Sequence, residues 1–154
     1  MYQWFVFVHL VGLVLFLMAH GTSAFVAFRM RTLRDVASVS DYLAMSQTAT
    51  RAMYVGFLFL LIGGAAAATV NDFWTTPWVL GSIVVFVAVL IGMWVVGASY
   101  YYKLRDLIAG KDGQPPISEE ALAVYLDSRR PEMLLAIGLG GLIVIVWLMV
   151  LKPG

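Results

Sequence analysis

Four stretches of the chain are almost continuously apolar, and each is long enough to cross a lipid bilayer. They cover residues 3–28, 52–70, 79–102 and 132–151. A transmembrane helix needs about 20 mostly apolar residues to cross about 30 Å of hydrocarbon. The first stretch begins without Lys or Arg and is too long for the apolar region of a signal peptide, so we interpret it as a span. The pattern predicts an all-α fold: a four-transmembrane-helix bundle forming one integral membrane domain over residues 1–154.

The connection after the third span contains signals for a helix end, a turn and a short helix. Gly110 is the predicted stop of a helix that continues the span, and residues 110–116 are rich in the Gly and Pro typical of a turn. Ser118 is the predicted N-cap of a short helix, because its hydroxyl can accept a backbone hydrogen bond. The apolar face of this helix consists of Leu122, Tyr125 and Leu126. That face lies either on the membrane surface or on the bundle.

The connection after the first span also contains a predicted helical segment. Residues 42–50 are expected to form a helix that leads into the second span, with Ser40 or Asp41 as its N-cap. Pro131 suits the first turn of the fourth span, where its missing N–H costs nothing. Both long connections are therefore expected to contain short helical segments.

The composition requires lipid as the solvent for most of the chain. Hydrophobic residues make up 62% of the sequence and charged residues only 12%, whereas a soluble domain averages about 45–50% and about 25%. This excludes a soluble enzyme, a nucleic-acid-binding protein and a disordered chain. The sequence contains no cysteine, which excludes disulfides, thiolate metal sites, iron–sulfur clusters and covalently attached c-type haem.

Basic residues define the expected orientation in the membrane. Nine of the ten lie in the two long connections: Arg29, Arg31, Arg34, Arg51, Lys103, Arg105, Lys111, Arg129 and Arg130. The positive-inside rule places these connections in the cytoplasm. We therefore expect a multi-pass protein of a bacterial inner (plasma) membrane, with both termini on the outer, periplasmic side.

Two histidines are the polar side chains in the spans that can carry chemistry. His9 and His20 both lie on the first span, 11 residues apart. On a helix this spacing puts them on one face, about 20° apart around the axis and about 16 Å apart along it. An ionisable residue inside a membrane is a functional hypothesis by default. The alternative is a neutral ring that is hydrogen-bonded to a carbonyl or hydroxyl of another helix.

Neutral imidazole binds haem iron, copper and zinc. His9 and His20 are too far apart to hold one metal, so they predict two sites at two depths. Met93 on the third span lies at about the depth of His20, which gives one candidate pair for haem or copper. A parallel homodimer gives another arrangement, with His9 opposite His9 and His20 opposite His20 in two stacked bis-histidine haem sites.

The spans lack the residues that other membrane functions need. No Asp, Glu, Lys or Arg lies deep in any span, whereas proton- and ion-coupled transporters usually need one near the midplane. The eight methionines are scattered rather than clustered as soft Cu(I) sites require. There is no nucleophile–base pair, so we expect no stand-alone catalytic activity.

The first span also resembles a known group of sequences. The segments Val8-His9-Leu-Val-Gly12, Ala19-His20-Gly21 and Phe28-Arg29-Met-Arg31 resemble the small four-span bacterial predicted integral membrane proteins. These are loosely similar to the copper-resistance D membrane domain, which also has histidines on membrane helices. The resemblance implies haem or copper as the ligand, with His9 and His20 as the matching positions.

Together these features predict a membrane-embedded haem b protein that transfers electrons. His9, His20 and Met93 are the candidate cofactor-binding residues, and His9 and His20 the candidate metal ligands. The expected partners are the lipid bilayer and either a second copy or a larger membrane redox complex. Two alternatives stay open: a non-catalytic accessory subunit of a membrane complex, and a copper-handling membrane protein.

Overall fold

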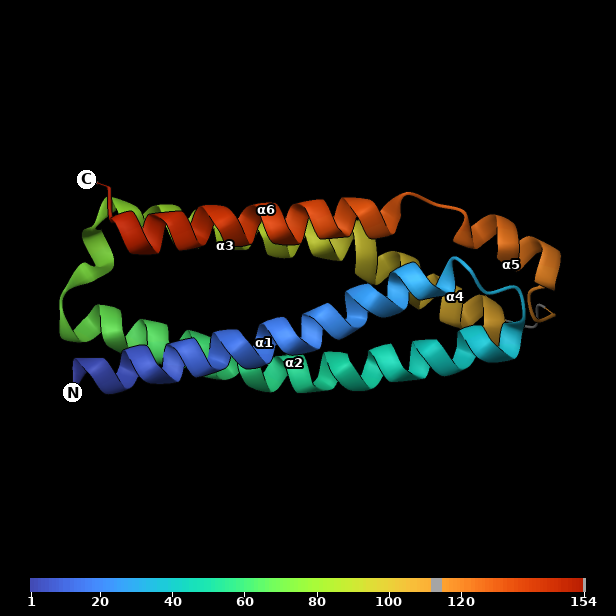
Figure 1. The fold of residues 1–154 in the computed structure, drawn as a ribbon, viewed down its shortest axis with the longest axis horizontal. Helices are drawn as coiled ribbons and strands as arrows, with labels where there is room; N and C mark the ends of the chain where they lie inside the picture. The colour runs from blue at the N-terminus through green and yellow to red at the C-terminus, as the bar shows by residue number, and fades with distance from the viewer. Residues whose placement is uncertain (112–114, 154) are drawn as a thin grey trace.

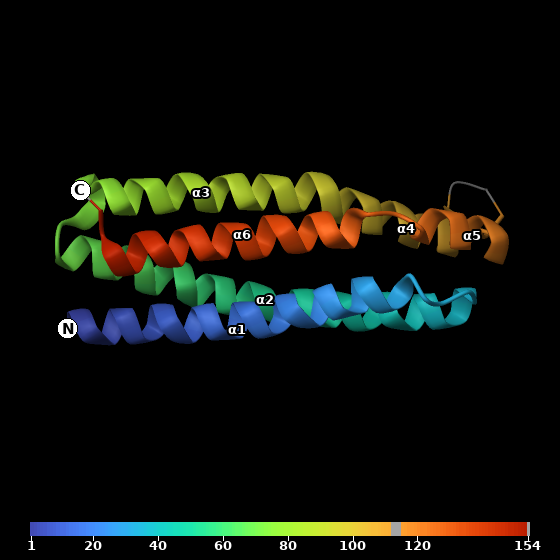
Figure 2. The same cartoon turned by 45° about the horizontal axis from the view of Figure 1, so that its top comes forward.

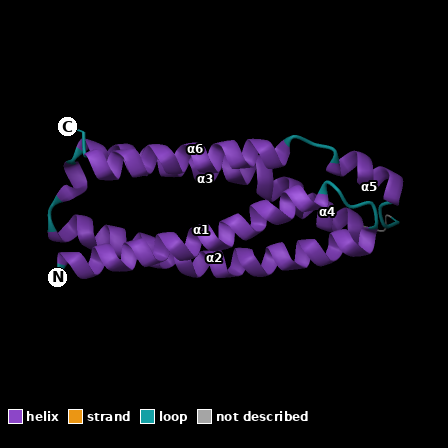
Figure 3. Cartoon of the chain, viewed as in Figure 1, coloured by secondary structure: helices purple, strands orange, loops and turns teal. Residues whose placement is uncertain are grey.

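The computed structural model describes residues 1–111 and 115–153, and all regular elements in these ranges are helices (Figure 3). Two antiparallel pairs form the bundle (Figure 1): α1 (Tyr2–Met30) with α2 (Val36–Val70), and α3 (Pro77–Met93) with α6 (Arg130–Leu151). The shorter elements are η1 (Phe73–Thr75), a π-helical segment (Trp94–Ala98), α4 (Ser99–Ala109) and α5 (Glu119–Leu126).

Both termini lie at one end of the bundle, which we call the terminal end (Figures 1 and 2). The two long connections lie at the opposite end (Figure 1), which we call the basic end because eight of the ten Lys and Arg residues lie in or next to them; Arg51 lies within α2. Four helical stretches are long and apolar enough to cross a membrane. The predicted all-α, four-span architecture is thus confirmed.

The second helix starts earlier than the sequence predicts. Neither Ser40 nor Asp41 is its cap: α2 begins at Val36, and the carboxylate of Asp35 accepts a hydrogen bond of 2.7 Å from the Ser38 N–H. The prediction was wrong because tertiary packing extends the helix upstream. Val39 is fully buried at the basic end, and its burial stabilises a turn that hydropathy alone does not reveal.

The other signals in the connections are confirmed where the structure describes them. Gly110 ends α4 with φ +62°, a left-handed conformation suited to glycine. Ser118 caps α5 by accepting from Ala121 N–H, and Pro131 lies in the first turn of α6. Within the predicted turn at 110–116, residues 112–114 lie outside the described residues.

Glycines bring α1 and α2 into backbone contact. A Cβ added at Gly12 would lie 2.2 Å from the Leu60 backbone nitrogen, and one added at Gly56 would lie 2.5 Å from that of Phe16. A Cβ added at Gly63 would lie 2.4 Å from the backbone nitrogen of His9. Small residues at such positions let membrane helices approach closely, where van der Waals packing drives their association.

The best-buried part of the protein lies at the basic end. Its core consists of Val26, Met30, Val39, Leu43, Leu104, Leu122 and Leu126, which come from α1, α2, α4 and α5. The apolar face of α5 therefore packs on the bundle. Elsewhere the spans present most large apolar side chains outward, as expected for helices that lipid surrounds.

The third span changes its helical geometry just after Met93. Residues 94–98 form a π-helical turn, and Figure 1 shows the helix changing direction there before α4. The Arg130 guanidinium donates a 2.8 Å hydrogen bond to the Val96 carbonyl and lies 4.9 Å from the centre of the Tyr100 ring. The start of α6 thus satisfies a carbonyl in this wider turn, a type often found at functional sites.

Candidate functional site

His9 lies against α2 near the terminal end. Its Nδ1 lies 2.7 Å from the Leu60 carbonyl oxygen, and a Cβ at Gly64 would come within 2.8 Å of the same nitrogen. Because a carbonyl can only accept, Nδ1 must donate. In the neutral ring the lone pair is then on Nε2, which is the arrangement typical of metal-ligating histidines.

His20 lies at the junction of the two helix pairs. Its Nε2 is 3.2 Å from the position that a Cβ on Gly138 of α6 would take. The terminal methyl of Met93, from α3, is 2.6 Å from that same position. The absence of a side chain at residue 138 thus lets the imidazole of one helix pair and the thioether of the other share one small region.

The His20 ring has an aromatic neighbour but no hydrogen bond to any described residue. It stacks on Phe16 with a centroid distance of 5.9 Å and an interplanar angle of 5°. Phe16 in turn packs near Phe57 of α2, with 6.3 Å between the ring centroids. Phe57 stacks on Phe86 of α3, with a centroid distance of 5.7 Å. These rings fix the imidazole plane while leaving both of its nitrogens without a polar partner in the described chain.

The two histidines face different neighbours, although they share one face of α1. Helices α1 and α2 cross obliquely (Figures 1 and 2), so the same face that meets α2 at His9 meets α3 and α6 at His20. His20 therefore points toward the interior of its own bundle. This geometry places His20 beside Met93.

This donor set limits the chemistry that the site can support. Among residues 1–111 and 115–153, no group of three or more His, Cys, Asp or Glu side chains comes together as a metal site. What the junction offers is one imidazole nitrogen and one thioether. That pair suits haem iron, as in proteins with His and Met axial ligands, or a soft copper ion.

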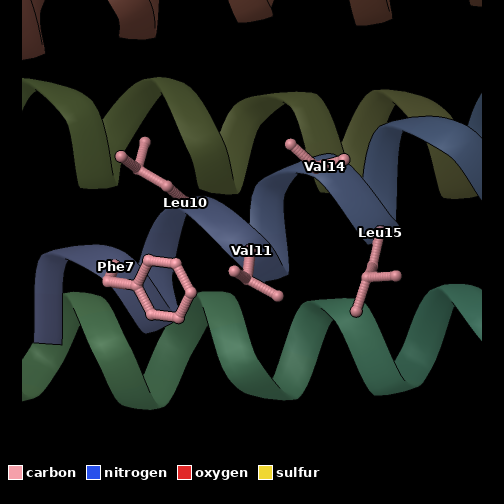
Figure 4. Close-up of a pocket in the computed structure, with 5 residues that line it drawn as sticks. All are labelled: Phe7, Leu10, Val11, Val14 and Leu15. Atoms are coloured by element: carbon pink, nitrogen blue, oxygen red, sulfur yellow. The ribbon is translucent and has the colours of Figure 1, made fainter. Parts of the chain in front are cut away.

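A shallow groove on α1 is a separate feature. Its volume is about 390 Å³, and its lining consists of Phe7, Leu10, Val11, Val14 and Leu15 (Figure 4). All five are apolar side chains of one helix. The groove includes neither histidine and has no polar side chain that could orient a ligand, so we place the candidate site at His20.

The sequence did not identify every residue of the candidate site. Met93 could be found by counting its depth from the helix ends. Gly138 could be recognised as a small residue, but not as the one opposite His20. At His9, the orienting group is the backbone carbonyl of Leu60, for which the Leu60 side chain gives no signal.

Fold and site together define a small four-span integral membrane protein with a polar junction between two helix pairs. The sequence profile of the family described as "Predicted integral membrane protein (DUF2269)" matches residues 3–153. The chain belongs to this family, in agreement with the resemblance noted from its first span. No curated protein and no solved structure matches the chain.

Proposed function

We propose that this protein is a haem b protein of the membrane that transfers electrons, and that His20 and Met93 would hold the haem. The observation that carries the proposal is that the Nε2 atom of His20 and the terminal methyl of Met93 both lie beside the position that a Cβ on Gly138 would take. Bound haem would supply an iron that takes up and releases one electron. The residues of the chain would hold it, fix the imidazole plane and keep water away.

His9 is the second proposed ligand, at a separate depth. Its hydrogen bond to the Leu60 carbonyl leaves Nε2 as the nitrogen that can bind a metal. Two haem sites at different depths would form an electron path along the bundle. Met93 serves only the site at His20, so the partner of His9 would come from a second copy or from a subunit of a larger redox complex.

Haem uptake by the purified protein tests the proposal directly. We expect a Soret band after expression with sufficient haem or after titration of the detergent-purified protein with haemin. His20→Ala should abolish the band of one site, and Met93→Leu should shift it from a low-spin to a high-spin form. Absence of a Soret band, or a band that none of His9→Ala, His20→Ala and Met93→Leu changes, would refute haem binding.

Two glycines of α6 provide a matched pair of variants for the same assay. A Cβ at Gly138 would collide with Met93 and crowd His20, whereas a Cβ at Gly140 would meet nothing within 4 Å. Gly138→Ala should therefore weaken haem binding strongly, while Gly140→Ala should bind haem like the wild type. Equal behaviour of the two variants would show that the ligand does not bind at this junction.

Copper handling remains the main alternative ligand chemistry. It predicts stoichiometric copper by elemental analysis, no Soret band, and loss of the metal in both His20→Ala and Met93→Leu.

An accessory, non-catalytic role is the second candidate function, and two observations favour it. The hydrogen bond of His9 and the glycine contacts of α1 with α2 are what pure helix packing would require. An accessory subunit should co-purify with a large membrane complex and have no pigment of its own. Its assembly should depend on Gly12 and Gly63 rather than on Met93.

We further propose that the basic end faces the cytoplasm of a bacterium and that both termini face the periplasm. The distribution of Lys and Arg supports this orientation. Because the chain contains no cysteine, single cysteines can be introduced without a background signal. A membrane-impermeant thiol reagent should label a cysteine at residue 152 in intact cells, but one at residue 105 only after the membrane is opened. The reverse pattern would refute this orientation.

A further inference from the structure

One hydroxyl group in the spans lacks the partner that the others have. The other Ser and Thr residues of the four predicted spans donate to the carbonyl four residues earlier, at 2.7–3.0 Å: Thr22, Thr69, Ser82 and Ser99. Ser23 does not. Its Oγ is buried, and it is the one side-chain oxygen or nitrogen in the described ranges that is fully enclosed without a hydrogen-bond partner.

This exception is informative because back-bonding is available to any helical serine. The carbonyl of Ala19 lies four residues before Ser23, as Met18 does for Thr22. A buried hydroxyl without a partner is unfavourable, particularly where lipid rather than water surrounds the protein. Such a group in a native structure calls for an explanation, and a bound polar group is one of the few available.

Ser23 lies next to the proposed haem site. It follows His20 by three residues, so the two side chains share one face of α1 and are about 4.5 Å apart along the axis. Ser23 lies on the side of His20 toward the basic end. The imidazole and the hydroxyl are therefore two neighbouring polar groups that find no hydrogen-bond partner in the described part of the protein.

We propose that the Ser23 hydroxyl donates a hydrogen bond to a carboxylate oxygen of the group that His20 binds. This inference rests on the proposed haem function. Haem b carries two propionate carboxylates at one edge, and these are its strong hydrogen-bond acceptors. That edge is best placed toward the basic end, where the charged residues lie, and Ser23 is the hydroxyl on that side of His20. Ser23 is therefore a haem-positioning residue.

The test is a haemin titration of the full-length protein in detergent, followed by the Soret band. Ser23→Ala should raise the Kd for haem b about tenfold, equivalent to about 1.4 kcal/mol, because hydrogen bonds to charged groups are the stronger ones. With haem dimethyl ester, in which both carboxylates are neutral esters, the same substitution should change Kd by less than about twofold. Thr22→Ala is the matched control, since it removes the adjacent, back-bonded hydroxyl.

Each result leads to a distinct conclusion. If Ser23→Ala binds haem b as tightly as the wild type while His20→Ala fails to bind, the role of Ser23 is refuted and haem binding by His20 stands. If Ser23→Ala weakens haem b and its dimethyl ester equally, the defect is one of packing and the inference is again refuted. If the wild type binds neither, the proposed function fails and this inference fails with it.

Discussion

Replacing Gly12 by Ala tests whether α1 and α2 really meet through bare backbone. The added Cβ would lie 2.2 Å from the Leu60 nitrogen and 2.7 Å from the Phe59 carbonyl carbon. Ordinary contacts of a Cβ begin at 3.4 Å, so the helices would have to separate by about 1.2 Å, the difference between 2.2 and 3.4 Å. A flexible side chain could move aside, but helical backbone cannot.

The expected loss of stability follows from three contributions. Overpacking costs about 1–3 kcal/mol, and we take the upper value because backbone must move. The higher helix propensity of Ala recovers about 1 kcal/mol. Separation by about 1.2 Å would also break the 2.7 Å hydrogen bond between His9 and Leu60, at about 1 kcal/mol. The net loss is about 3 kcal/mol.

Unfolding in mixed micelles with increasing SDS, followed by circular dichroism and tryptophan fluorescence, measures this loss. Gly21→Ala is the matched control on the same helix, because its Cβ would meet nothing within 4 Å. We expect Gly21→Ala to be as stable as the wild type, or more stable by up to about 1 kcal/mol. If Gly12→Ala behaved like Gly21→Ala, α1 and α2 would not pack in this register.

Two further predictions concern the basic end. Leu122→Ala should destabilise the protein by about 3 kcal/mol, because Leu122 is fully buried. Val124 lies on the same helix but is 78% exposed, so Val124→Ala should change stability by less than about 0.5 kcal/mol. Thermal melts in detergent compare the two variants, and equal effects would contradict the placement of α5. The hydrogen bond from Ser38 N–H holds the pKa of Asp35 below its ordinary value of 3.8. The ionised cap therefore stabilises α2 above that ordinary value, and this contribution is lost as the pH falls through the lowered pKa. Asp35→Asn should flatten this part of the acid dependence of the melting temperature, and an unchanged slope would refute it.

Hydropathy was sufficient for the number and order of the spans, because about 20 apolar residues in succession have few alternatives to a membrane helix. Local signals were sufficient at Gly110, Ser118 and Pro131, where one residue determines a helix end. They failed at the start of α2, where burial of Val39 in a core built from four helices decides the boundary. No local signal marks the π-helical turn at 94–98 either, since its carbonyl partner, Arg130, is far away in sequence.

At the candidate site, too, some features follow from the sequence and others depend on tertiary packing. Counting residues along straight helices was enough to place Met93 at the depth of His20, because the rise per residue is fixed. The direction in which each histidine points depends on how α1 crosses its neighbours, which is a property of three-dimensional packing. The unpartnered hydroxyl of Ser23 could not be anticipated, because every other span hydroxyl follows the local rule that the sequence would suggest.

The helices of the first pair have 29 and 35 residues, or about 43 and about 52 Å at 1.5 Å per residue, well beyond about 30 Å of hydrocarbon. Each of these helices thus extends from the hydrocarbon into the aqueous phase, and different denaturants act on its two portions. Urea, which acts from the aqueous phase, should melt the cluster around Leu104 while leaving the lipid-immersed rods helical. The protein is then expected to unfold in two stages rather than one, and a single unfolding midpoint would describe neither stage.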